Sequence, residues 1–239
     1  MSLQAPIIDL SPEVLAEARH VFLSAEPYPH VVLDELWRDD FLRDVANEIP
    51  TIQRWSGEKN FSGSVQKKWL SEWEYMPLNV NRLLTFLNGD SFLDLLSMIT
   101  SVDKLKSDPY LEGGGVHSTG NGGFLKLHTD FNWNTKLQLL RKLNVLVYVN
   151  EDWHDEYKGD LLLAKKQHAG PPAIIKRIAP VFNRTVIFIT DANSVHGHPE
   201  PLCLPPEKRR DSLATYYYVS SVNDTHEYIQ KKQTDTTYY

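Results

Sequence analysis

Two histidines and one aspartate have the types and spacing of a metal-binding set. One residue separates His128 from Asp130, and His196 follows much later in the chain. Side chains two residues apart in a strand point to the same face, so His128 and Asp130 can converge on one ion. Two imidazoles and one carboxylate can hold Fe(II) on one side and leave the opposite positions open for other ligands. The set therefore predicts a non-haem iron site.

An arginine farther along the chain could anchor an organic acid. Arg210 and Ser212 stand at the start of the run 212–219, which is rich in the aromatic and β-branched residues typical of strands. Alternation along a strand places Arg210 with Ser212 on one face and sends Arg209 to the other. A guanidinium can hold a carboxylate through two parallel hydrogen bonds. If the Arg210 face lines a cavity, Arg210 and Ser212 contact the same ligand.

The third metal ligand has two candidates on these grounds. His196 and His198 lie on one face of an extended segment that follows the strand-prone run 185–190. Pro199 restricts the backbone of His198 to extended conformations, which does not exclude that histidine from binding a metal. Residue types and spacing alone leave both histidines open.

Composition limits the class of protein. The chain has 239 residues, 41% of them hydrophobic and 23% charged, as in an ordinary globular protein. Its net charge of −6 argues against nucleic-acid binding, which usually needs a basic surface. Cys203 is the single cysteine, so there is no intrachain disulfide, and a reducing compartment is favoured. We find neither a signal-peptide pattern nor the roughly 18 apolar residues of a membrane helix, and expect a soluble, cytoplasmic protein.

The character of the sequence changes near residue 113. Before it, helical patterns dominate, and afterwards short strands alternate with turns and with glycine clusters at 113–115 and 120–123, which act as breakers. Expected helices begin after Ser11 and cover 38–49 and 80–99, and a short strand is expected at 29–33. Later strands are expected at 123–129, 143–149, 160–164, 185–190, 195–198 and 212–219. This order predicts a mainly β fold with supporting helices and a jelly-roll core. A Greek-key sandwich without a site, or two subdomains, are the alternatives.

The sequence resembles the iron- and 2-oxoglutarate-dependent oxygenase superfamily, in its prolyl-hydroxylase-like branch. The resemblance runs from about Asp108 to Val219 and is carried by the segments 122–132, 143–150 with Trp153, 195–199 and 209–218. It implies a double-stranded β-helix with helices packed on one sheet. We expect one oxygenase domain over 1–239, with helical support at 1–112, the jelly-roll catalytic core at 113–220 and a C-terminal tail at 221–239.

The resemblance also assigns roles to residues. It implies that the iron ligands, which are also the catalytic residues, are His128, Asp130 and His196. It implies that the 2-oxoglutarate contacts are Arg210, for the distal carboxylate, with Ser212, Tyr148 and Asn144. Two positions depart from the family pattern. Leu125 and the pair His117-Ser118 stand where relatives often have tyrosines. Either His117 replaces one of these tyrosines or fewer contacts hold the co-substrate.

The implied activity is a dioxygenase that uses Fe(II), 2-oxoglutarate and O2 to hydroxylate a small molecule such as an amino acid or another metabolite. Asp130 supports hydroxylation, because halogenases of this superfamily have a small residue at that position. A protein prolyl hydroxylase acting on a peptide loop and a non-catalytic metal-binding jelly-roll protein are the alternatives. A closed pocket would favour a metabolite, and an open groove beside an exposed sheet edge would favour a peptide. Neither a nucleic acid nor a membrane is expected as a partner.

Substrate selectivity is expected in the loops around the site. The candidate segments are 55–75, which is either a lid or a plain surface connection, and 132–136 beside the first ligands. Lys136 and Arg141 are expected to be solvated charges, with contact to a negatively charged substrate as the alternative.

Overall fold

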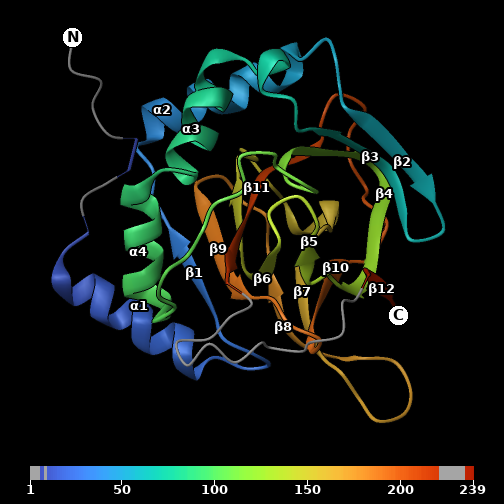
Figure 1. The fold of residues 1–239 in the computed structure, drawn as a ribbon. Helices are drawn as coiled ribbons and strands as arrows, with labels where there is room; N and C mark the ends of the chain where they lie inside the picture. Colours follow the sequence, from blue (N-terminus) through green and yellow to red (C-terminus); the bar gives the residue numbers. More distant parts are fainter. Residues whose placement is uncertain (1–5, 8–9, 221–234) are drawn as a thin grey trace, which may run out of the picture.

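The structure is a computed structural model that describes residues 6–7, 10–220 and 235–239. Curved antiparallel strands form two facing layers, and the helices lie together on one side of β9, β6 and β11 (Figure 1). The helices are α1 (Pro12–Ser24), α2 (Asp39–Glu48), α3 (Leu78–Leu87) and α4 (Asp90–Thr100), with short 3-10 turns at Ile49–Thr51, Trp73–Tyr75 and Asp155–Tyr157. The strands are β1 (His30–Asp34), β2 (Gly57–Phe61), β3 (Ser64–Leu70), β4 (Gly115–Thr129), β5 (Trp133–Asn134), β6 (Leu139–Tyr148), β7 (Leu161–Lys165), β8 (Ala173–Ile178), β9 (Arg184–Ile189), β10 (Ser194–His198), β11 (Arg210–Val219) and β12 (Thr237–Tyr238). The predicted mainly β jelly roll with supporting helices is confirmed.

Strand β4 is shared by the two layers. Its first part pairs with β11, and its last part pairs with β10, so the order runs β1-β9-β6-β11-β4-β10-β7-β8. The glycine cluster at 120–123 lies where the strand passes from one partner to the other. Gly122 has a φ of +73°, and a Cβ on Gly123 would lie 2.9 Å from the carbonyl oxygen of Val65, so side chains are poorly tolerated there. The sequence predicted a break at these glycines followed by a strand at 123–129. In the structure the glycines lie within one longer strand, β4.

Alternation along β6 separates the main core from the interior between the layers. Leu143, Val145 and Val147 are fully buried in the cluster that includes the helices. The residues between them, Asn144, Leu146 and Tyr148, point the other way and line a cavity. One strand therefore contributes both to the apolar core and to a polar interior wall.

The helix predicted over 80–99 is two helices. Helix α3 ends at Leu87, and the Asn88 side chain donates to the carbonyl of Leu84 at 2.8 Å. Gly89 is extended, with φ −85° and ψ 158°, and α4 starts at the next residue. The extended residue between the two apolar helical patterns ends one helix and begins the next, so that both helices bury leucines in the core.

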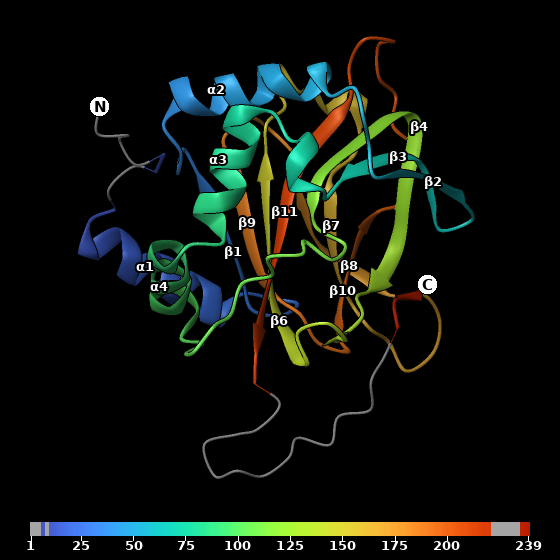
Figure 2. The same cartoon turned by 45° about the horizontal axis from the view of Figure 1, so that its top comes forward.

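Segments outside the predicted strands complete the sheet. The region 55–75 contains the β2–β3 hairpin, and β3 pairs along β4 (Figure 2). With β1, this hairpin adds strands to the first 112 residues, which we had expected to be mostly helical. In the predicted tail, residues 221–234 lie outside the described part, and β12 pairs with β4 at Thr129 and His128. No helix in the described part of the chain is long and apolar enough to cross a membrane.

Tyr217 links the helical layer to the sheet and provides a test of that packing. Its hydroxyl donates to the carbonyl of Leu87 at 2.8 Å from a fully buried position. We expect Tyr217→Phe to lower the free energy of unfolding by about 1–3 kcal/mol, because it leaves a buried carbonyl without its partner. Urea denaturation measures this change. Tyr110→Phe, at a tyrosine that is 54% exposed, is the control, and an equal effect in both variants would contradict the account.

Candidate active site

The structure brings all the predicted site residues to one cavity between the two layers. The cavity is lined by His128, Asp130, His196, Asn144, Tyr148, Arg210 and Ser212. They come from β4 and its end, β6, β10 and β11, whose inward faces surround the cavity. The strand register therefore collects residues that are far apart in the sequence.

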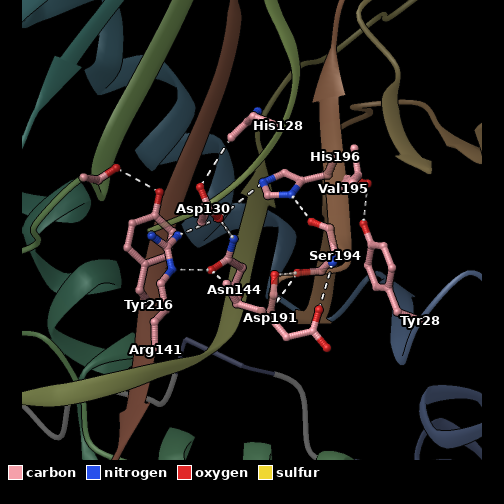
Figure 3. Close-up of polar contacts among 12 residues, drawn as sticks. Tyr28, His128, Asp130, Arg141, Asn144, Asp191, Ser194, Val195, His196 and Tyr216 are labelled. Carbon is pink, nitrogen blue, oxygen red and sulfur yellow. Dashed lines mark hydrogen bonds and ion pairs between the residues drawn. The ribbon is translucent and has the colours of Figure 1, made fainter. Parts of the chain in front are cut away.

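His128, Asp130 and His196 form a group suited to one metal ion. His128 and His196 are directly opposite each other on β4 and β10, with ring centroids 4.5 Å apart. The Nε2 atom of each ring lies 3.4 Å from an oxygen of Asp130 (Figure 3). One donor atom from each residue lies within 4.8 Å of the other two. The donors fit a metal ion that takes two imidazoles and one carboxylate on a single side.

Both histidines are oriented from behind by backbone carbonyls. The Nδ1 atom of His128 lies 2.9 Å from the carbonyl of Lys126, and that of His196 lies 3.0 Å from the carbonyl of Ser194. Because a carbonyl only accepts, Nδ1 carries the proton, and the lone pair is on Nε2, which points toward Asp130. Burial lowers the pKa of His196 to about 4 even though Asp130 opposes the shift, so this ring is neutral at neutral pH. Neutral imidazoles are the form that binds metals.

Asp130 is held ionised by Arg141 and Asn144. The guanidinium of Arg141 forms an ion pair with Oδ2 at 3.0 Å, and the Asn144 amide donates to the same oxygen at 2.8 Å. Burial raises the pKa of Asp130, but the charge of Arg141, together with the contacts of the two histidines, outweighs burial and holds that pKa well below its ordinary value. The Asn144 oxygen in turn accepts from Arg141 Nε at 3.0 Å and from Thr190 at 3.0 Å. These contacts fix the direction of the carboxylate.

The expectation that Arg141 is a solvated charge is wrong. Its side chain is 1% exposed, and its guanidinium lies 3.3 Å from the centre of the Tyr216 ring. Simple alternation would place Arg141 with Leu143, away from the cavity. A bulge changes this, because Arg141 and Leu143 pair with consecutive residues of β11 and leave Lys142 as an extra residue. Lys136 is exposed as expected.

His198 also lines the cavity but lies outside the metal-binding group of the described residues. A register shift separates it from His196 along β10. Its Nδ1 atom is buried and has no hydrogen-bond partner among those residues, so no carbonyl orients the ring as in His128 and His196. The geometry therefore favours His196 as the third ligand.

Arg210 forms the other end of the cavity. Its Nε donates to the carbonyl of Gly159 at 2.7 Å, and one terminal nitrogen donates to the Tyr148 hydroxyl at 3.2 Å. Ser212 is directly opposite Tyr148 on the neighbouring strand. The guanidinium is thus fixed in place beside two hydroxyl groups, a suitable arrangement for a carboxylate.

Arg209 points away from the cavity, as strand alternation predicted. Its Nε donates to the Ser118 hydroxyl at 2.6 Å, and a terminal nitrogen donates to the Ser118 carbonyl at 3.0 Å. The two adjacent arginines therefore lie on opposite faces of β11, which makes them a matched pair for experiments.

Sequence reasoning assigned no site role to several further lining residues, among them Lys59, Lys67, Thr236 and Tyr238. The Tyr238 ring lies 5.5 Å from the ring of His128 and 5.7 Å from that of Phe61. The lysines lie in segment 55–75, a candidate segment for substrate selectivity, but no local pattern singles out these residues, because their positions depend on pairing with β4.

Residues 114–218 match the family model described as the 2OG-Fe(II) oxygenase superfamily. This match covers the strands that carry the metal donors and Arg210. It supports a 2-oxoglutarate-dependent dioxygenase, since that superfamily uses Fe(II), 2-oxoglutarate and O2. No curated protein matches the sequence. The donor set described above fits the metal, and the Arg210 end of the cavity fits a carboxylate.

Solved structures share the fold of this oxygenase at low sequence identity. A prolyl-4-hydroxylase from Pseudomonas putida is 15% identical with a TM-score of 0.58, over 85% of this chain and 98% of that chain. A prolyl hydroxylase from Trichoplax adhaerens, in complex with a peptide fragment of the hypoxia inducible factor oxygen degradation domain, is 16% identical with a TM-score of 0.59, over 93% and 98%. HygX from Streptomyces hygroscopicus, with nickel, 2-oxoglutarate and hygromycin B bound, is 12% identical with a TM-score of 0.56, over 96% and 97%.

Metal binding distinguishes the two candidate histidines in this oxygenase. We expect His196→Ala to abolish stoichiometric Fe(II) binding, because it removes an oriented Nε2 donor, and His198→Ala to bind within a few-fold of the wild type. Anaerobic calorimetric titration with Fe(II) measures both affinities. Normal binding by His196→Ala together with loss in His198→Ala would reverse the assignment.

The support given to Asp130 has its own prediction. Asn144→Leu should weaken Fe(II) binding by about 10–100-fold, the usual effect of removing a hydrogen bond to a metal ligand. The same titration measures the affinity, and circular dichroism of the metal-free variant checks that it folds. An unchanged affinity in a folded variant would mean that Asn144 does not position the carboxylate.

Proposed function

We propose that this chain hydroxylates a small molecule, with Fe(II) held by His128, Asp130 and His196. In this proposal Arg210, with the hydroxyls of Tyr148 and Ser212, holds the distal carboxylate of 2-oxoglutarate. The support is that both sets line one cavity: the metal donors lie at the end of β4 and in the middle of β10, and the arginine lies at the start of β11. A dicarboxylic acid held by both sets needs such a shared cavity.

The protein's part in the reaction is to orient and to exclude water. Bound Fe(II) supplies the activation of O2 while 2-oxoglutarate is decarboxylated to succinate and CO2. Asp130 and the two histidines would hold the ion from one side and would leave its other side for the co-substrates. Asn144 and Arg141 keep the carboxylate from rotating, since both bind the same oxygen. Phe188 packs against the His196 ring at 4.8 Å, so apolar surface encloses this ligand.

The observation that carries the choice of a small molecule is the pairing of β12 at the metal ligands. His128 is paired with His196 of β10 on one side and with Tyr238 of β12 on the other. An extended peptide that adds to a sheet needs a strand edge with unpaired backbone groups. Strand β4 offers no such edge at His128. Thr236 and Tyr238 also line the cavity. With these residues in its wall, the cavity is closer to an enclosed pocket than to an open peptide groove.

A non-catalytic metal-binding role accounts for less of the site. Three donors suffice to bind a metal, whereas the fixed Arg210 guanidinium at the far end has no role in metal binding. Burying an arginine costs free energy unless a partner offsets the charge, so its position supports an acidic ligand.

Turnover tests the proposed function. A panel of free metabolites and of proline-containing peptides should be incubated aerobically with Fe(II) and 2-oxoglutarate, and scored by succinate release and by mass gain of one oxygen atom. We expect gain of oxygen on a metabolite. If only peptides gain oxygen, the small-molecule proposal is replaced by the peptide one. If no compound supports turnover of 2-oxoglutarate, the metal-binding alternative is favoured.

Arg210 and Arg209 test the co-substrate end of the cavity. Arg210→Ala should raise the 2-oxoglutarate concentration needed for half-maximal turnover by roughly two to three orders of magnitude, because loss of one partner of a buried ion pair costs about 3–5 kcal/mol and about 1.4 kcal/mol is tenfold. Arg209→Ala should change it little, since that side chain points away. Titration of 2-oxoglutarate into both variants measures the effect. Equal losses would contradict the assignment.

A further inference from the structure

Two lysines of the β2–β3 hairpin line the cavity, and the proposed function leaves them without a role. Lys67 lies on β3 and Lys59 on β2, and both border the same cavity as Arg210. The hairpin lies against β4, where it forms the wall beside the arginine (Figure 2). A polar wall that the metal and 2-oxoglutarate do not use is available to the substrate.

The register of four neighbouring strands sets the positions of these lysines. Arg210 is directly opposite Thr119, Thr119 is directly opposite Lys67, and Lys67 is directly opposite Lys59. Directly opposed residues of antiparallel strands share a face, and all four line the cavity. With strands about 4.8 Å apart, the Lys67 backbone is about 10 Å from that of Arg210, and the Lys59 backbone is about 14 Å away. The cationic row, Arg210 to Lys59, thus extends away from the acid-binding end.

Neither lysine side chain has an anionic partner in the part of the chain that the structure describes. No side-chain hydrogen bond or ion pair joins Lys67 or Lys59 to a residue there, although Lys59 Nζ lies 5.5 Å from the Trp69 ring centre. Lys68, the next residue, faces the other way and pairs with Glu58 at 3.1 Å. Burial, together with the charges of Lys59 and Arg210, lowers the pKa of Lys67 to about 7. An unpaired cation in a cavity is stabilised when an anion binds beside it.

The other charges of the cavity are already matched. Asp130 is the single carboxylate among the described lining residues, and Arg141 is its ion-pair partner. In the proposed function Arg210 faces the distal carboxylate of 2-oxoglutarate. The charges of Lys67 and Lys59 therefore remain for a further ligand.

We propose that Lys67 and Lys59, with the Thr119 hydroxyl between Lys67 and Arg210, bind a doubly charged oxyanion group of the substrate, such as a phosphate or sulfate ester. This inference rests on the proposed function for the identity of the ligand as substrate. Two ammonium groups act as point charges and suit a dianion that offers oxygens in several directions. The anionic group would lie under the β2–β3 hairpin, and the remainder of the molecule would extend toward the metal ligands.

Binding of inorganic sulfate tests the site without turnover. Sulfate is titrated calorimetrically into the anaerobic protein loaded with Fe(II) and saturating 2-oxoglutarate, at constant ionic strength set with chloride. We expect Lys67→Gln and Lys59→Gln each to weaken sulfate binding by about tenfold, and acetate to bind the wild type more weakly than sulfate. Lys68→Gln is the matched control and should bind sulfate as the wild type does. Sulfate binding that survives in both cavity variants, or falls equally in Lys68→Gln, would overturn the proposal.

Two further measurements separate this site from the co-substrate and identify the ester. The 2-oxoglutarate requirement of Lys67→Gln should stay within a few-fold of the wild type, and a rise like that expected for Arg210→Ala would assign Lys67 to 2-oxoglutarate and overturn the proposal. Each metabolite should be tested in its free, phosphorylated and sulfated forms. We expect the enzyme to release succinate from 2-oxoglutarate only when one of the esters is present. Turnover of neutral forms alone would overturn the anion site and leave the hydroxylase intact, whereas sulfate binding without turnover of any compound would count against the hydroxylase alone.

Discussion

Asp130 carries a negative charge on a side chain that is 11% exposed, and its neighbours are arranged around that charge. Such a group is costly to bury unless it is paired and hydrogen-bonded. Arg141 and Asn144 supply the ion pair and the hydrogen bond to Oδ2, and each oxygen also lies 3.4 Å from a histidine Nε2 atom. The site can form only when the end of β4 meets the inward face of β6, so the fold and the metal-binding group depend on the same strand packing.

The central strands β6 and β11 divide the molecule by alternation. Their outward residues, among them Val145 and Tyr217, are buried under the helices, and their inward residues face the cavity. The helical layer therefore fixes the position of each inward side chain indirectly, through a rigid sheet. Residues whose orientation must be accurate lie on these strands. The hairpin and β12 pair along β4 outside these central strands, and β12 contacts the metal-binding group through His128.

Much of the site follows from local sequence, because local geometry fixes it. The spacing of His128 and Asp130 and the parity that separates Arg210 from Arg209 hold for any strand, and both agree with the structure. Arg141 was missed because a bulge at Lys142 reverses the alternation, and such a bulge leaves no clear mark in the sequence.

Long-range pairing explains the remaining differences. Lys67, Lys59 and Tyr238 reach the cavity only because their strands pair with β4, and no local pattern specifies that partner. The single helix expected over 80–99 is two helices, which are separated at Asn88 and Gly89. The apolar spacing is helical on both sides of this break, so the periodicity did not indicate it. Periodicity therefore identified the types of element, whereas tertiary contacts determined where some of them end.

An anaerobic crystal structure of the protein with Fe(II) and 2-oxoglutarate tests the central claim most directly. The account predicts one ion bound by Nε2 of His128, Nε2 of His196 and an oxygen of Asp130, with the distal carboxylate of 2-oxoglutarate on Arg210 and the Tyr148 hydroxyl. An ion coordinated by His198 in place of His196, or a distal carboxylate on Lys67 with Arg210 unoccupied, would contradict it.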